Sequence, residues 1–183
     1  MSIRQLNASY VPEEDRVMLR FTTDTQEEYR LWLTRAVVGT LLDQTQALAV
    51  KALEQQGNVH QAKEVAQFKQ QALQQSATYT QFEGAARFPL GAEPVLVRTV
   101  QAQFRENSSV LVLALARGQN LTLTLSEDLV GKLQLLLQKM SSAARWALGS
   151  PEAVYPSAPA QVAGKASEPA DSPDTSTPPK VLH

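Results

Sequence analysis

The stretch RVMLRFTTDTQEEYRLWLTRAVVG, residues 16–39, decides the fold of this chain. Apolar side chains occupy every second position twice in it, first at Val17, Leu19 and Phe21 and then at Tyr29, Leu31 and Leu33. Alternation with a period of two is typical of a strand that buries one face. The polar link between the two runs predicts an antiparallel turn. Thr34 is suited to cap a helix, because its hydroxyl can accept a hydrogen bond from a free backbone N–H.

The flanking residues complete a strand-strand-strand-helix unit over residues 3–56. Before the stretch, residues 6–10 begin to alternate, and the proline and acids of residues 12–15 then interrupt them. This pattern predicts a first strand followed by a hairpin turn whose acids are solvated. After the cap, apolar residues recur at helical spacing to about residue 56, which predicts the helix that ends the unit.

The stretch VLVLALARGQNLTLTLSEDLVG, residues 110–131, has the same organisation. Four pairs of segments align in the same order: Ala8-Ser9-Tyr10 with Ala102-Gln103-Phe104, Val17-Met18-Leu19 with Leu111-Val112-Leu113, Leu33-Thr34 with Leu125-Ser126, and Val38-Gly39 with Val130-Gly131. The order of the elements, the alternation of buried positions and the cap residues all match, so we interpret residues 95–148 as a second copy of the unit. The alternative is an ordinary α+β domain whose amphipathic strands resemble one another.

Two further segments lie between the copies. Residues 58–78, rich in Gln, Ala and Lys, predict a helical insert that folds back on the first helix, and residues 79–94 contain four Gly and Pro residues and predict an irregular connector. We therefore predict one α+β domain over residues 1–149. It consists of two antiparallel three-stranded meander-plus-helix repeats with a helical hairpin between them.

The composition changes after Gly149. Seven of the ten prolines lie between Pro151 and Pro179, among Ser, Ala, Thr and Asp and with few large apolar residues. Such a segment cannot bury enough apolar surface to offset the entropy lost on ordering. Residues 150–183 are therefore predicted to be a disordered tail.

The residue inventory restricts the chemistry. The chain has no cysteine, two histidines and a net charge of -1, so thiolate metal sites, disulfides and broad attraction to nucleic acid or anionic lipid are not indicated. It contains no glycine-rich phosphate loop, no GxSxG and no HExxH. We predict no catalytic residue, cofactor or metal site, and thus no enzyme. The start lacks a basic segment followed by an apolar run, from which we expect a cytoplasmic protein.

One candidate site lies on the outward face of the first predicted sheet. If the alternating apolar residues face the helices, the opposite face carries Glu28 and a cluster that we call the Arg-Trp face: Arg16, Met18, Arg20, Arg30 and Trp32. Guanidinium groups beside a tryptophan can bind phosphates and stacked bases, and they can equally receive carboxylates of a peptide. A plain solvated face is the remaining interpretation.

The equivalent positions of the second repeat are small and mostly apolar. We call them the second-sheet face: Val110, Val112, Ala114 and Ala116, followed on the next strand by Thr122 and Thr124. An uncharged sheet face of this kind is seldom left in water. The sequence predicts that it packs either on the second helix of the same chain or on another chain in a twofold dimer.

Two resemblances accompany these patterns. The segments YVPEEDR (residues 10–16) and EYRLWLTR (residues 28–35), with the FPLG turn at residues 88–91, resemble a family of small uncharacterised proteobacterial proteins. This resemblance implies a bacterial, cytoplasmic protein and does not indicate an activity. A tandem of meander and helix is also similar to the whirly and PUR families, which bind single-stranded nucleic acid. The chain departs from them in having three strands per unit and a charge close to neutral.

Together these observations favour a non-enzymatic protein-interaction or adaptor module. Its partner would be another protein or, in a homodimer, a second copy, held by the Arg-Trp face and the proline-rich tail. The alternative is a single-stranded nucleic-acid-binding protein that uses the Arg-Trp face.

Overall fold

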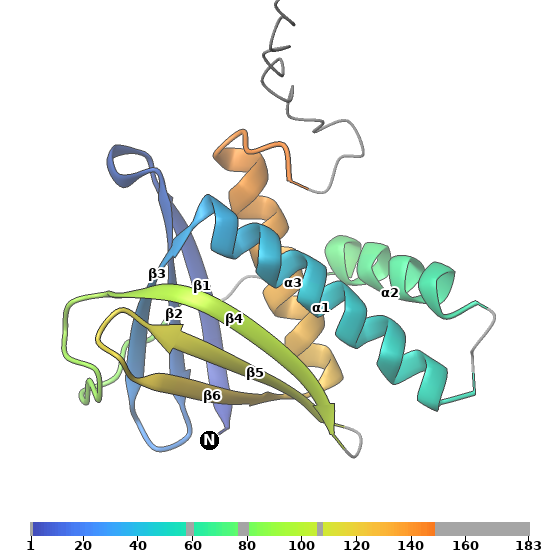
Figure 1. The fold of residues 1–183 in the computed structure, drawn as a ribbon, viewed down its shortest axis with the longest axis horizontal. Helices are drawn as coiled ribbons and strands as arrows, with labels where there is room; N and C mark the ends of the chain where they lie inside the picture. The colour runs from blue at the N-terminus through green and yellow to red at the C-terminus, as the bar shows by residue number, and fades with distance from the viewer. Residues whose placement is uncertain (1, 58–60, 77–80, 106–107, 149–183) are drawn as a thin grey trace, which may run out of the picture. The chain divides into compact units, whose positions relative to one another are not determined.

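The computed structural model describes residues 2–57, 61–76, 81–105 and 108–148. The elements in chain order are β1 (Ile3–Val11), a 3₁₀ turn (Pro12–Glu14), β2 (Arg16–Thr23), β3 (Glu28–Thr34), α1 (Arg35–Gln55), α2 (Ala62–Ser76), β4 (Val95–Arg105), β5 (Ser108–Leu115), β6 (Asn120–Leu125) and α3 (Glu127–Ala143). They form a six-stranded mixed sheet in the order β1-β2-β3-β4-β5-β6, with helices packed on one face (Figure 1).

Each half of the sheet is an antiparallel meander, β1–β3 and β4–β6. The halves join through a short parallel pairing of β3 with β4, which involves Leu31 with Val95 and Trp32 with Leu96. Figure 1 shows the strands of the second meander running across the direction of the first. The predicted α+β fold of two meander-plus-helix units is therefore confirmed, as is the hairpin of α1 and α2.

The two helix caps are equivalent in geometry. The hydroxyl of Thr34 accepts a hydrogen bond from the backbone N–H of Val37 at 3.3 Å, and that of Ser126 accepts one from Leu129, also at 3.3 Å. Each cap satisfies an N–H that the first helical turn leaves without an intrahelical partner. The cap residues identified in the sequence therefore start α1 and α3.

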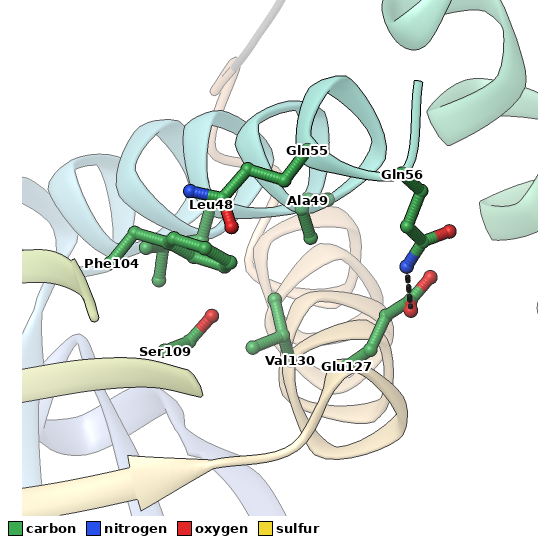
Figure 2. A pocket seen from close by; sticks show the side chains of 9 residues that line it. Leu48, Ala49, Gln55, Gln56, Phe104, Ser109, Glu127 and Val130 are labelled. Atoms are coloured by element: carbon green, nitrogen blue, oxygen red, sulfur yellow. Dashed lines mark hydrogen bonds between the residues drawn. The ribbon is translucent and has the colours of Figure 1, made fainter. Parts of the chain in front are cut away.

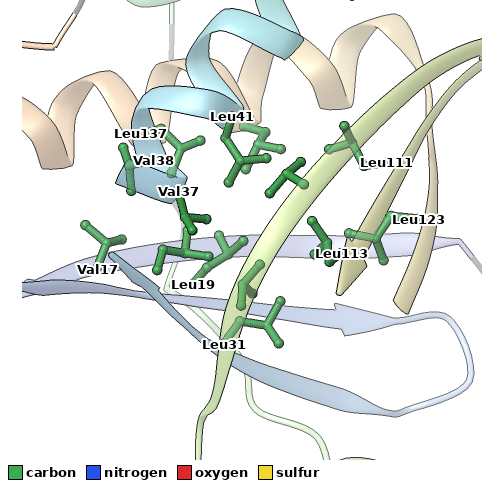
Figure 3. Close-up of a cluster of buried hydrophobic side chains, with 14 of the residues drawn as sticks. Val17, Leu19, Leu31, Val37, Val38, Leu41, Leu111, Leu113, Leu123 and Leu137 are labelled. Carbon is green, nitrogen blue, oxygen red and sulfur yellow. The ribbon is translucent and has the colours of Figure 1, made fainter. Parts of the chain in front are cut away.

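α1 and α3 pack on each other, and each contacts the meander of the other unit more than its own. α1 contacts β4 more extensively than β2 or β3, and α3 contacts β1 more extensively than β5 or β6. Figure 3 shows one cluster drawn from both meanders and both helices: Val17, Leu19, Leu31, Val37, Val38, Leu41, Leu111, Leu113, Leu123 and Leu137. All of these side chains are at most 6% exposed. The two units therefore share a single core.

The end of α3 differs from the prediction, which extended this helix to about residue 148. Arg145 adopts a left-handed conformation (φ 54°), and the N–H groups of Arg145 and Trp146 donate to the carbonyls of Ser142 and Ser141. This is a Schellman motif, which ends a helix by satisfying its last carbonyls. The turn directs Trp146 toward the hairpin between β1 and β2.

The indole of Trp146 ties the end of α3 to the first meander. Its N–H donates to the Asp15 carboxylate at 2.9 Å, and the Tyr10 hydroxyl donates to the same oxygen at 2.9 Å. The Tyr10 and Trp146 rings meet edge to face, with centroids 5.7 Å apart. Asp15 is exposed, as expected for a turn, but it also anchors two aromatic side chains.

The remaining boundary differences are small. The predicted helical insert over 58–78 is α2, Ala62–Ser76, and its predicted ends at 58–60 and 77–78 lie outside the described residues. The described part of the connector, residues 81–94, contains no helix or strand, as predicted. The predicted tail at 150–183 also lies outside the described residues.

A shared core predicts a single cooperative unfolding transition. We expect Leu41→Ala in α1 and Leu137→Ala in α3 each to lower the free energy of unfolding of the whole domain by about 3 kcal/mol, because each leaves a cavity between both units. Urea unfolding followed by far-ultraviolet circular dichroism and by tryptophan fluorescence should give coincident curves for both variants. Separate transitions for the two units would contradict the shared core.

Candidate functional site

The centre of the Arg-Trp face is a buried ion cluster around Glu28. One carboxylate oxygen of Glu28 accepts hydrogen bonds from Arg20 Nε at 3.0 Å and from Arg30 Nε at 2.8 Å. The other accepts the backbone N–H of Ala85 at 3.1 Å. The Glu28 side chain is only 1% exposed, so this residue, predicted on an open outward face, is buried.

The connector, residues 81–94, covers this cluster. The guanidinium of Arg20 lies 4.4 Å from the ring centroid of Phe82, and that of Arg30 lies 4.7 Å from the ring of Phe88. Arg30 also donates to the carbonyl of Ala92 at 3.0 Å. The two arginine side chains are 27% and 28% exposed, so they are held between the sheet and the connector.

The connector approaches Glu28 closely at Gly84. A Cβ atom on Gly84 would lie 3.0 Å from the carboxylate oxygen of Glu28 that accepts the Ala85 N–H. A larger residue there would have to displace a carboxylate that hydrogen bonds already hold in place. The sequence places Gly84 in the connector, but only the structure shows that a small residue there leaves room for the Glu28 carboxylate.

The surroundings of Glu28 keep its carboxyl ionised. Burial raises the pKa of Glu28, but hydrogen bonds from Arg30, Ala85 and Arg20, together with the charge of Arg20, outweigh this effect, and the pKa is lowered overall. The carboxylate is therefore charged at neutral pH and holds two arginines that would otherwise be available to an anionic ligand.

The other members of the Arg-Trp face lie outside this cluster. Arg16 forms an exposed ion pair with Glu14 at 3.4 Å. Met18 and Trp32 are partly exposed and lie opposite each other on β2 and β3. The structure therefore divides the predicted site into a connector-covered part, Arg20 and Arg30, and an open apolar part, Met18 and Trp32.

The second-sheet face lies on the outer side of β5. The alternating residues Leu111, Leu113 and Leu115 are at most 2% exposed in the core, so Val110, Val112 and Ala114 point away from the helices. Ala116 follows the strand and is partly exposed. Among the described residues no helix packs on this side, because α1 and α3 lie on the other and α2 packs on those two helices. The predicted alternative of burial under the second helix is therefore wrong.

The cross-strand neighbours of Val110 and Val112 are uncharged. Val110 lies between Gln103 and Thr124, and Val112 lies between Gln101 and Thr122. All four neighbours are exposed. Val110 and Val112 thus form an apolar strip of β5 between polar, uncharged side chains of β4 and β6.

A cavity of 350 Å³ opens between α1, α3 and the β4–β5 hairpin (Figure 2). Its apolar wall includes Leu48, Phe104 and Val130. At one side Glu127 accepts hydrogen bonds from Gln56 at 3.4 Å and from Lys69 at 2.6 Å. The bond from Lys69 outweighs burial and lowers the pKa of Glu127.

Sequence reasoning missed this cavity. Its lining comes from four separated segments, in α1, β4, β5 and α3, and no motif links them. A second cavity, of 390 Å³, lies between α1, α2 and α3 and shares Ala49 and Glu127 with the first. Within the described ranges, no three His, Cys, Asp or Glu side chains gather in a way that would hold a metal ion.

Comparison with known proteins does not assign this chain to a family. No protein-family model, curated protein or solved structure matches this chain. In the part of the chain that the structure describes, no helix combines the length and the apolarity needed to cross a membrane. The interpretation of the site therefore rests on the chain's own contacts.

The Glu28 cluster predicts a specific dependence of stability on pH. We expect Glu28→Gln to lower the free energy of unfolding by about 2 to 3 kcal/mol at pH 7, because it removes a buried charge from two arginines. Since the folded-state pKa is lowered, this stabilisation is complete above the ordinary pKa of about 4.3 and is lost as the pH falls through the lowered pKa. Urea unfolding across this range should show the wild-type and variant free energies converging in acid.

Glu83→Gln is the matched control for this prediction. Glu83 lies in the connector next to Gly84, but its side chain is 72% exposed, and its carboxylate lies 3.6 Å from the Arg4 guanidinium. We expect its free energy of unfolding to stay close to wild type, as for most exposed pairs. Equal effects of the two substitutions would contradict a special role for the buried carboxylate.

Proposed function

We propose that this protein is a non-enzymatic protein-interaction module of the cytoplasm that binds its partner through the second-sheet face. The observation that carries the proposal is the outward apolar row Val110, Val112, Ala114 and Ala116, which has no covering helix in the described chain. Uncharged side chains border it at Val110 and Val112. All four side chains are partly exposed, and large contiguous apolar patches on a folded domain mark interaction sites.

The chemistry of the cavity in Figure 2 supports a binding role over catalysis. Its polar lining consists of the Gln55 and Gln56 amides, the Ser109 hydroxyl and the Glu127 carboxylate. The carboxylate is engaged by Lys69 and Gln56, not by the hydroxyl. A nucleophilic hydroxyl requires a base within hydrogen-bond distance, which this arrangement does not provide.

The Arg-Trp face supports the nucleic-acid alternative less well. Arg20 and Arg30 already donate to Glu28 and lie beneath aromatic rings of the connector. A phosphate would have to compete with a buried carboxylate for both guanidinium groups. The contacts of the arginines therefore favour a structural role, which fixes the connector, over phosphate binding.

Oligonucleotide binding tests the choice between these two functions. We expect the fluorescence anisotropy of a labelled single-stranded oligonucleotide to stay unchanged on addition of the protein, even at low salt. Binding that weakens steeply with salt and is lost in Arg20→Ala and Trp32→Ala would establish phosphate contacts and contradict the proposal. An Arg4→Ala variant, which alters an exposed cation of the same sheet, controls for general charge effects.

Site-specific photocrosslinking in the native cell tests the interaction face itself. A photoreactive amino acid at Val112 should form covalent adducts with protein, because this position is at the centre of the proposed binding face. The same amino acid at Ala47, an exposed position of α1 in the helical layer, should give none. Equal or absent adducts at both positions would contradict the proposed face.

A further inference from the structure

The second-sheet face continues onto the first meander. Trp32 lies opposite Met18 on β2 and beside Leu96 on β4, and the N–H of Ala116 donates to the carbonyl of Leu96 at 2.8 Å. These four side chains form what we call the seam row, which crosses β2, β3, β4 and the end of β5 on the outer side of the sheet. All four are apolar and partly exposed.

The seam row supplies the residue types that anchor protein interfaces. Tryptophan and methionine are enriched in interface cores, and tryptophan is among the commonest residues whose truncation weakens binding strongly. Trp32 lies where the outer sides of the two meanders meet, next to the open strip of β5. One continuous apolar surface therefore joins Met18 and Trp32 to the second-sheet face.

The polar groups beside this surface can pair with copies of themselves. Gln101, Gln103, Thr122 and Thr124 carry amides and hydroxyls, each of which both donates and accepts hydrogen bonds. β5 and β6 contain no charged residue, and the charges of β4 are Arg98 in its bulge and Arg105 at its end. Two copies can therefore stack these rows without bringing like charges together at the centre.

The available area indicates that an interface would need both the second-sheet face and the seam row. β5 has eight residues, so the outer side of three strands measures about 26 Å by 14 Å, or roughly 370 Å² in projection. A stable interface buries about 800 Å² per partner. The strip of the second meander alone falls short of this area, and the seam row extends it across two further strands.

We infer that the partner bound by this surface is a second copy of the chain, stacked face to face about a twofold axis beside Val112, with Trp32 as an anchor. This inference rests on the proposed function and names its partner. A twofold interface presents the same patch from both copies, so every group must tolerate its own counterpart. The polar groups on either side of Val110 and Val112 are uncharged and both donate and accept hydrogen bonds, so this part of the surface meets that requirement.

Sedimentation equilibrium of the purified full-length chain tests the inference. We expect a dimer, and a dissociation constant raised about 30-fold or more in Trp32→Ala. Val112→Glu places two carboxylates together at the axis and should give a monomer, whereas an equimolar mixture of Val112→Glu and Val112→Lys should recover the dimer mass. Ala47→Glu, on the helical layer, should remain dimeric.

A second substitution guards against misfolding of the Val112 variants. Thr122 is exposed and lies next to Val112 on β6, so Thr122→Glu should keep the wild-type circular dichroism and still weaken the dimer. A wild-type chain that stays monomeric at high micromolar concentration would overturn the inference. So would a dimer whose mass is unaffected by both Val112→Glu and Thr122→Glu.

Crosslinking of the purified chain from position 112 separates this inference from the proposed function. A product of twice the chain mass supports the second copy. A product of single mass linked to residues 149–183 identifies the chain's own tail as the occupant and overturns the inference. Adducts with other proteins in the cell, with a monomeric purified chain, overturn the second copy but retain the interaction module. No adduct in either setting overturns both.

Discussion

The structure depends on the exchange of helices between the two units. Neither meander is covered by its own helix alone: α1 lies chiefly over β4, and α3 lies chiefly over β1. Leucines and valines that are buried in the core therefore come from both units at once. An apolar sheet face is buried against another element, and here each meander is covered by helices of both units, so the two units bury their cores together. The two meander-plus-helix units therefore fold as one domain.

Two sets of polar contacts fix the end of α3 and the connector against the first meander. The Schellman turn after α3 brings Trp146 to Asp15, which joins the last helix to the first hairpin. On the other side of the sheet, the connector is held by Glu28 and its two arginines. A buried carboxylate is tolerated there because charged donors and a backbone N–H satisfy it. Both contacts join residues that are far apart in the chain.

The two outer sheet faces have opposite chemistry although the units are repeats. The first carries arginines, of which Arg20 and Arg30 donate to Glu28 and lie against aromatic rings of the connector. The second carries valine and alanine between uncharged polar rows, and the described chain places no helix on it. Intramolecular contacts with Glu28 and the connector already engage the guanidinium groups of Arg20 and Arg30. The apolar face is therefore the surface on which a partner would bury the most apolar area.

The amino-acid sequence by itself determined the strands, the two helix caps and the duplication, because these depend on period-two alternation and on hydroxyl residues at fixed places. It also determined which side of β5 points outward. Only the tertiary structure decided that Glu28 is buried, that Arg20 and Arg30 are engaged, and that Trp32 joins Leu96 and Ala116 in one row. Those outcomes depend on where an irregular connector crosses the sheet and on which strands of different units become neighbours. Local periodicity carries no information about either, because both are set by contacts between residues distant in the chain.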